Sequence, residues 1–156
     1  MSYSFAFTFH LLGAVIWVGG MFFAHMILRP SAIEKLEPPN RLTLWLAVFG
    51  RFFLWVWISV IVILITGYWM IFDVFGGLAG LKASYIQIMH GIGLMMTAIY
   101  CYIYFVLFKQ FKTAVNNKQF PVGGAIINKI RNLVTTNLVL GIITIIVASG
   151  GKYINL

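Results

Sequence analysis

Four long apolar runs, each able to cross a lipid bilayer, constrain the fold of this chain more than any other feature of its sequence. A helix needs roughly 20 apolar residues, with a rise of about 1.5 Å each, to span a hydrocarbon core of about 30 Å. The runs lie at about 4–28, 43–72, 85–108 and 133–149 in a chain of 156 residues that is 62% hydrophobic and 9% charged. We therefore expect an all-α integral membrane protein, a four-helix antiparallel bundle that forms a single domain over residues 1–156.

The first run is not typical of a removable signal peptide. No basic region precedes it, and no small-residue cleavage pattern follows it. We expect this run to be kept as a membrane helix and the mature chain to begin at Met1.

The basic residues are divided unequally between the two sides of the expected bundle. Only Lys82 and Lys152 fall on the side of the termini. The other nine are Arg29, Lys35, Arg41, Arg51, Lys109, Lys112, Lys118, Lys129 and Arg131. By the positive-inside rule, this division predicts a multi-pass protein of the bacterial inner membrane with both termini on the periplasmic side. The net charge of +8 then reflects topology and attraction to membrane lipid, not a nucleic-acid partner, and a homo-oligomer is compatible with the sequence.

Prolines and glycines mark the expected connections between the helices. Pro30 and then Pro38-Pro39 predict a short rigid turn between the first two helices. The connection at 109–131 is expected to begin as a continuation of the third helix and to turn around Gly123-Gly124. The short, glycine-rich connection at 73–84 predicts that the second and third helices are antiparallel neighbours.

His10 and His90 lie at matched depth in two different helices. Each is about two helical turns or less from the same side of the bundle, so both are expected roughly 7–9 Å below one membrane surface. Two such imidazoles can converge on one metal, and haem iron, copper and zinc all accept imidazole as a ligand. The alternative for each ring is a hydrogen bond to a neighbouring helix. His25, beside Arg29 at the cytoplasmic end, is expected to be an interfacial histidine.

Small residues near both histidines leave room for a flat group between the helices. Gly13 and Trp17 follow the first histidine at helical spacing, and Gly93 follows the second. Such gaps suit a haem in a bundle core, although glycines also permit close helix packing. Arg51, in the second helix, is expected to meet an anionic group such as a haem propionate, a quinone head group or a lipid phosphate, or else to extend to the membrane surface.

Copper is an alternative metal, with methionines and Cys101 as soft ligands beside the histidines. The seven methionines are scattered over several helix faces and form no Met-x-x-Met motif. Zinc hydrolysis would need a buried carboxylate, whereas the acids of the chain, Glu34, Glu37 and Asp73, lie in or beside the connections.

Several motifs resemble those of a known family. The first helix carries His10-Leu-Leu, Trp17-Val-Gly-Gly-Met21 and Leu28-Arg29-Pro30, and the second carries Gly50-Arg51-Phe52-Phe53 followed by Leu64-Ile65-Thr66-Gly67-Tyr68. These motifs are similar to those of the CopD-like (copper resistance D) four-helix membrane proteins, which are distantly related to the HemJ-type protoporphyrinogen oxidases that bind haem b. The resemblance implies a four-helix membrane protein that binds a cofactor. HemJ-type chains present a lysine just after a histidine of the third helix, where this chain has Ile-Gln-Ile-Met-His90.

The function that we expect is binding of b-type haem by a membrane oxidoreductase. The metal ligands would be His10 and His90, and the cofactor would be surrounded by Gly13, Trp17, Gly93 and Arg51. Two neutral imidazoles leave no open position on the iron, which favours electron transfer with a quinone or an outer-face partner. The alternatives are copper transport or resistance, HemJ-like oxidation of protoporphyrinogen, and a structural subunit whose histidines only join helices.

Overall fold

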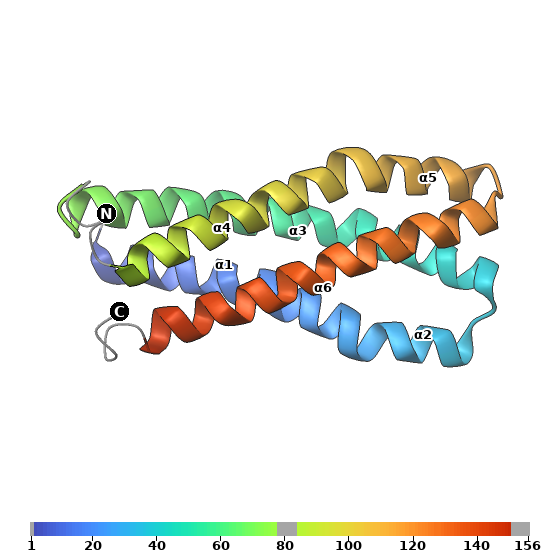
Figure 1. Ribbon diagram of the computed structural model, residues 1–156, viewed down its shortest axis with the longest axis horizontal. Coiled ribbons are helices and arrows are strands. Elements are labelled where there is room, and N and C mark those ends of the chain that lie inside the picture. Colours follow the sequence, from blue (N-terminus) through green and yellow to red (C-terminus); the bar gives the residue numbers. More distant parts are fainter. Residues whose placement is uncertain (1, 78–83, 151–156) are drawn as a thin grey trace.

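The computed structural model describes residues 2–77 and 84–150, and nearly all of these residues are helical. Four long helical segments run antiparallel, so that Ser2 and Gly150 lie at the same end of the bundle (Figure 1). The segments are α1 (Tyr3–Phe23) with the π-helical turn η1 (Ala24–Leu28) and α2 (Arg29–Lys35); α3 (Pro38–Asp73); α4 (Ser84–Tyr102) with the π-helical turn η3 (Ile103–Phe108) and α5 (Lys109–Asn116); and α6 (Phe120–Gly150). The expected all-α bundle is confirmed.

Each of the four segments is long and apolar enough to cross a membrane. Large hydrophobic side chains such as Leu54 and Ile146 are exposed on the outside of the bundle, as contact with lipid tails requires. The protein is a multi-pass membrane protein. We call the end with the turns after α2 and α5 the basic end, because the nine basic residues of the connections lie in that half. The opposite end is the terminal end, and Lys82 and Lys152 lie outside the described residues.

Pro30 does not end the first helical segment, and the expectation of a break there is wrong. Pro30 is one of the first residues of α2, and the π-helical turn before it closes with the Arg29 N–H donating to the Ala24 carbonyl. Proline lacks an N–H, and its ring crowds the carbonyl four residues earlier, so a locally widened helix accommodates both effects. The chain turns at Leu36, whose backbone is extended (φ −127°, ψ 135°), just ahead of Pro38.

The turn expected around Gly123-Gly124 is wrong as well. Both glycines lie inside α6, and the chain reverses at 117–119, where Lys118 has a φ of 57°. A Cβ at position 123 would stand 3.4 Å from Leu42 Cδ1 and 3.6 Å from Val115 Cγ2. These are ordinary contact distances, so position 123 is a buried packing position of α6 against α3 and α5 with room for a Cβ, and it does not serve as a turn.

A layer of aromatic rings joins α3 to the segment formed by α4, η3 and α5. Phe53 packs edge-on against Phe108 with ring centres 5.0 Å apart, and Trp57 packs edge-on against Tyr100 at 5.1 Å. The Tyr100 hydroxyl donates to the Phe53 carbonyl oxygen at 2.8 Å. Because edge-to-face pairs add about 0.5–1.5 kcal/mol beyond burial, this layer holds the α1–α3 half of the bundle to the α4–α6 half.

Gly13 brings α1 into close contact with α3. A Cβ at this position would lie 2.9 Å from Ile63 Cγ1 and 3.3 Å from the Ser59 carbonyl oxygen. Small residues at such interfaces allow two membrane helices to approach. Gly19 lies on the same helix but is exposed, and within the described part of the chain no atom of another element stands within 4 Å of its Cβ position.

We predict that Gly13→Leu destabilises the protein by about 1–3 kcal/mol, because the added side chain overpacks the contact with α3. Gly19→Leu is the matched control, since it adds the same side chain to the same helix and gains the same helix propensity. Thermal unfolding of the purified protein in detergent, followed by circular dichroism, measures the difference. Equal stability of the two variants would contradict the assignment of Gly13 to packing.

Candidate functional site

His10 and His90 face one cavity near the terminal end of the bundle. The cavity has a volume of about 460 Å³ and lies between α1, α3, α4 and α6. His10 reaches it from α1 and His90 from α4, and both residues are half-buried. We call this space the histidine cavity. Its volume lies in the range of ordinary small-molecule sites, and most of its lining is apolar.

The side chain of Thr66 orients the ring of His10. Thr66 Oγ1 lies 3.0 Å from His10 Nδ1 and donates its own hydrogen to the Val62 carbonyl oxygen at 2.6 Å. Because a hydroxyl has one hydrogen, a Thr66 that donates to Val62 can only accept from His10, and this arrangement puts the proton on Nδ1. The lone pair of His10 is then on Nε2, where it is free to bind a metal or to accept a hydrogen bond.

His90 is positioned by an aromatic contact. Its ring packs edge-on against Tyr68 of α3, with ring centres 5.4 Å apart and an interplanar angle of 81°. Among the described residues, its ring nitrogens have no hydrogen-bond partner in the protein.

The other residues expected at the site separate into two groups. Trp17 and Gly93 line the histidine cavity, and a Cβ at position 93 would meet no atom of another described element within 4 Å. Gly13 faces α3, as described above, and does not line the cavity. Arg51 is exposed on α3 and lines neither this cavity nor the second one at the basic end. The structure thus brings together His10, His90, Trp17 and Gly93, and it leaves Gly13 and Arg51 outside.

The donor set of the histidine cavity consists of imidazoles and thioethers. Within residues 2–77 and 84–150, no three residues among His, Cys, Asp and Glu stand close enough to hold a metal ion together. Two imidazoles from different helices can hold a haem iron in a helical bundle. The thioethers of Met70, Met89 and Met96 also line the cavity, and thioethers together with imidazole suit Cu(I).

Three residues of α3 belong to the site although they were not predicted as site residues from the sequence: Thr66, Gly67 and Tyr68. Thr66 and Tyr68 contact the two histidines, and a Cβ at position 67 would stand 3.1 Å from His10 Cε1. All three lie near the terminal end of α3, at the depth of the histidines. The same argument from depth, applied to the second helix, would have found them.

His25 lies outside the histidine cavity. It is in η1 and faces a second cavity at the basic end, and its Nδ1 is 3.4 Å from Thr135 Oγ1. The two ends of the bundle therefore have different sites, with one pair of histidines at the terminal end and the third histidine among arginines at the basic end.

The fold and the site define a class: a small multi-pass membrane protein with an intramembrane cavity faced by histidines from two helices. Residues 46–150, more than half of the chain, match the family described as Copper resistance protein D. The chain belongs to this family. The matched part extends from α3 to the end of α6, so it includes His90 but not His10. Comparisons with curated proteins and with solved structures find no match.

We predict that Thr66→Val removes the acceptor of the His10 Nδ1–H and weakens the preference for that tautomer. The lost hydrogen bond should also lower stability by about 1 kcal/mol. The ¹⁵N chemical shifts of the His10 ring in the purified protein report the tautomer. Thr66→Ser keeps a hydroxyl at this position and serves as the control, and unchanged ring shifts in Thr66→Val would show that Thr66 does not set the tautomer.

Proposed function

We propose that the histidine cavity binds a b-type haem between His10 and His90 and that the protein is an electron-transfer component of the membrane. The observation that carries this proposal is the pair of half-buried imidazoles that face one apolar cavity from two helices. Membership of the copper resistance protein D family suggests a copper-related function in the membrane and does not itself point to haem.

Each residue of the cavity would have a defined task toward the haem. His10 would bind the iron through Nε2, because Thr66 engages its Nδ1. His90 would bind from the opposite helix, and the indole of Trp17 would pack against the edge of the ring. When bound, a haem with two imidazole ligands supplies one-electron transfer and has no open position for oxygen. The apolar lining would exclude water from the iron and so influence its potential.

The orientation that we propose puts the basic end in the cytoplasm. Nine of the eleven basic residues belong to that half, and the positive-inside rule places such connections on the cytoplasmic side. In a bacterial inner membrane the histidine cavity would then lie near the periplasmic face. A membrane quinone or a periplasmic redox partner could reach it there.

Copper handling is the second candidate function, and the lining of the cavity supports it. Three methionines, Met70, Met89 and Met96, face the same space as His10 and His90. Thioether and imidazole groups are soft or borderline ligands that Cu(I) accepts. The family match points in the same direction.

The haem proposal predicts a Soret band in the purified protein, either as isolated or after reconstitution with haemin. His10→Ala and His90→Ala should each lose the spectrum of a low-spin haem, either by loss of the haem or by a shift of the band, because each removes one of the two imidazoles that would hold the iron. His25→Ala, which changes the third histidine outside this cavity, should keep the wild-type spectrum. Optical absorption of the wild type and the three variants measures the outcome.

Elemental analysis of the same samples separates the two candidate functions. Stoichiometric copper that is lost in His10→Ala and His90→Ala, with no Soret band in any sample, would replace the haem proposal by the copper one. A wild type with neither haem nor copper after reconstitution would refute both.

The proposed orientation predicts that the two ends of the bundle react differently with a membrane-impermeant maleimide. In a Cys101→Ser background, a cysteine introduced as Ser2→Cys should be labelled in intact bacteria that express the protein. A cysteine introduced as Asn117→Cys, in the turn between α5 and α6, should be labelled only after the cells are broken. Both positions are exposed in the structure, so the reverse pattern would mean the opposite topology.

A further inference from the structure

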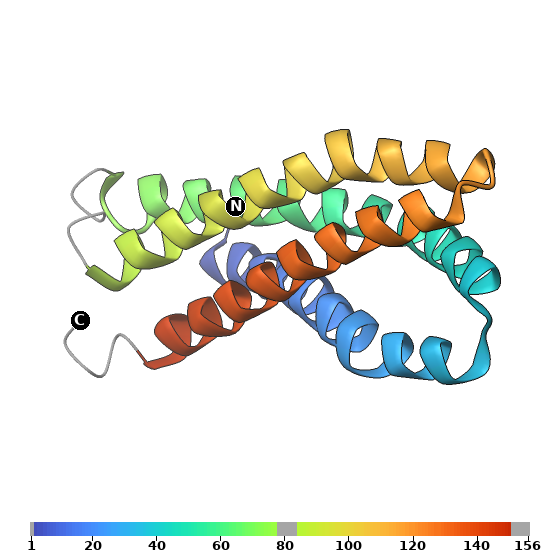
Figure 2. The same ribbon diagram turned by 45° about the vertical axis from the view of Figure 1, so that its right-hand side comes forward.

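A second cavity lies at the basic end of the bundle, between α2, α3 and α6. Its volume is about 440 Å³, and the side chains of Arg29, Arg41 and Arg131 line it from these three helices. Both views of the bundle show α2 and α6 diverging toward this end (Figure 1, Figure 2). We call this space the arginine cavity. It is separate from the histidine cavity and shares no lining residue with it.

The three arginines differ from the other basic residues of this half in their burial. Arg29, Arg41 and Arg131 are half-buried. The other six are exposed: Lys35, Arg51, Lys109, Lys112, Lys118 and Lys129. The half-buried basic residues of this half are thus all arginines, and all of them line one cavity. Since a partly buried cation is stabilised by a counter-charge, this arrangement favours a bound anion.

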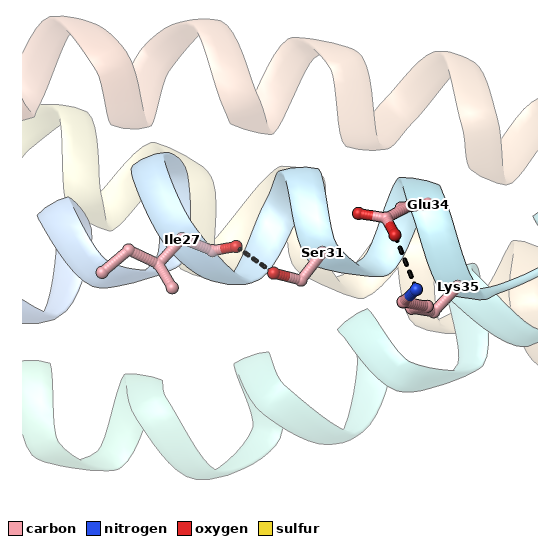
Figure 3. Close-up of polar contacts among 4 residues, drawn as sticks. All are labelled: Ile27, Ser31, Glu34 and Lys35. Atoms are coloured by element: carbon pink, nitrogen blue, oxygen red, sulfur yellow. Dashed lines mark hydrogen bonds and ion pairs between the residues drawn. The ribbon is translucent and has the colours of Figure 1, made fainter.

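The protein itself does not supply this anion among the described residues. In that part of the chain the only ion pair joins Lys35 Nζ to Glu34 Oε1 at 2.6 Å, and both side chains are well exposed. Figure 3 shows this pair on α2, next to Ser31, whose hydroxyl donates to the Ile27 carbonyl at 2.9 Å. The other acids, Glu37 and Asp73, are exposed and pair with none of the three arginines.

The geometry of the lining selects the kind of anion. A guanidinium presents a planar fork of N–H donors that matches the oxygens of a phosphate. Beside these donors the lining is apolar and aromatic, with Trp45, Phe49 and Phe120 prominent. A free inorganic anion would leave this apolar surface uncovered, whereas an anion that carries a hydrocarbon chain would cover it. The site lies toward the basic end of the helices that are long enough to span a membrane, where lipid head groups are expected.

We propose that the arginine cavity binds the phosphate group of an anionic phospholipid from the surrounding leaflet, with Arg29, Arg41 and Arg131 as the phosphate ligands. The acyl chain next to the head group would lie against the aromatic part of the lining. This binding is independent of the cofactor in the histidine cavity, so either proposal can fail without the other.

The test measures binding of phosphatidylglycerol and phosphatidylcholine to the full-length protein in detergent by native mass spectrometry. The wild type should retain phosphatidylglycerol in preference to phosphatidylcholine. Arg29→Gln, Arg41→Gln and Arg131→Gln should each weaken binding of phosphatidylglycerol about fivefold, since each basic residue near a lipid surface contributes about 1 kcal/mol. Arg51→Gln is the matched control, because it removes an exposed arginine from the same half of the bundle and should leave binding unchanged.

Three outcomes would overturn the proposal. An equal loss in Arg51→Gln would mean general attraction between a basic protein and anionic lipid. Displacement of phosphatidylglycerol by millimolar inorganic phosphate would mean a site for free anions, whereas resistance to displacement supports the lipid. A wild type without preference for phosphatidylglycerol over phosphatidylcholine would refute the proposal even if a variant failed to fold.

Discussion

The crossing of α1 and α6 near Gly141 is the contact on which both cavities depend. A Cβ at position 141 would lie 2.8 Å from Val18 Cγ2 and 3.3 Å from Met96 Cε, so a glycine is needed for the two helices to approach this closely. Helices that touch at one point and cross at an angle separate on either side of it. Toward the terminal end this separation makes room for the histidine cavity, and toward the basic end it makes room for the arginine cavity. In a membrane, where lipid tails are as apolar as the helices, such close contacts and interhelical hydrogen bonds determine packing because hydrophobic burial cannot.

Several polar side chains of this bundle have one of two roles: some join two helices by a hydrogen bond, and others face a cavity. Thr66 and Tyr100 each form a hydrogen bond to a neighbouring helix, and Asn137, which is 1% exposed, donates from Nδ2 to the Met96 carbonyl at 3.1 Å. His10 serves both purposes, because Nδ1 is used within the protein and Nε2 is left for the cavity. The three half-buried guanidinium groups at the basic end face only the cavity. A partly buried polar group that faces a cavity can be stabilised by a ligand, whereas the buried Asn137 Oδ1 has no hydrogen-bond partner among the described residues and lines neither cavity.

Hydropathy alone was enough to predict the four spans, and depth was enough to predict that His10 and His90 lie at one level. Both arguments depend only on counting residues along a helix axis. The face of each helix could not be predicted in the same way, because helices that are apolar all round have no amphipathic pattern to orient them. For this reason Gly13 and Arg51 were grouped with the histidines, whereas the structure turns Gly13 toward α3 and Arg51 outward. The two wrong turn predictions have a related cause, because proline and glycine are both common in turns. In the structure Pro30 is accommodated by a π-helical turn, and Gly123 is packed inside α6 against α3 and α5.

The charges at the basic end also bear on the choice between a binding site and a transport path. A copper ion that crossed the bundle from the histidine cavity would have to pass the buried aromatic layer around Phe53 and Tyr100. At the basic end it would meet three half-buried arginines, whose positive charge would repel a cation whenever no anion is bound between them. An anion or a neutral molecule meets no such barrier at that end. Movement of a metal cation through the bundle would therefore need a route past both the aromatic layer and the arginines.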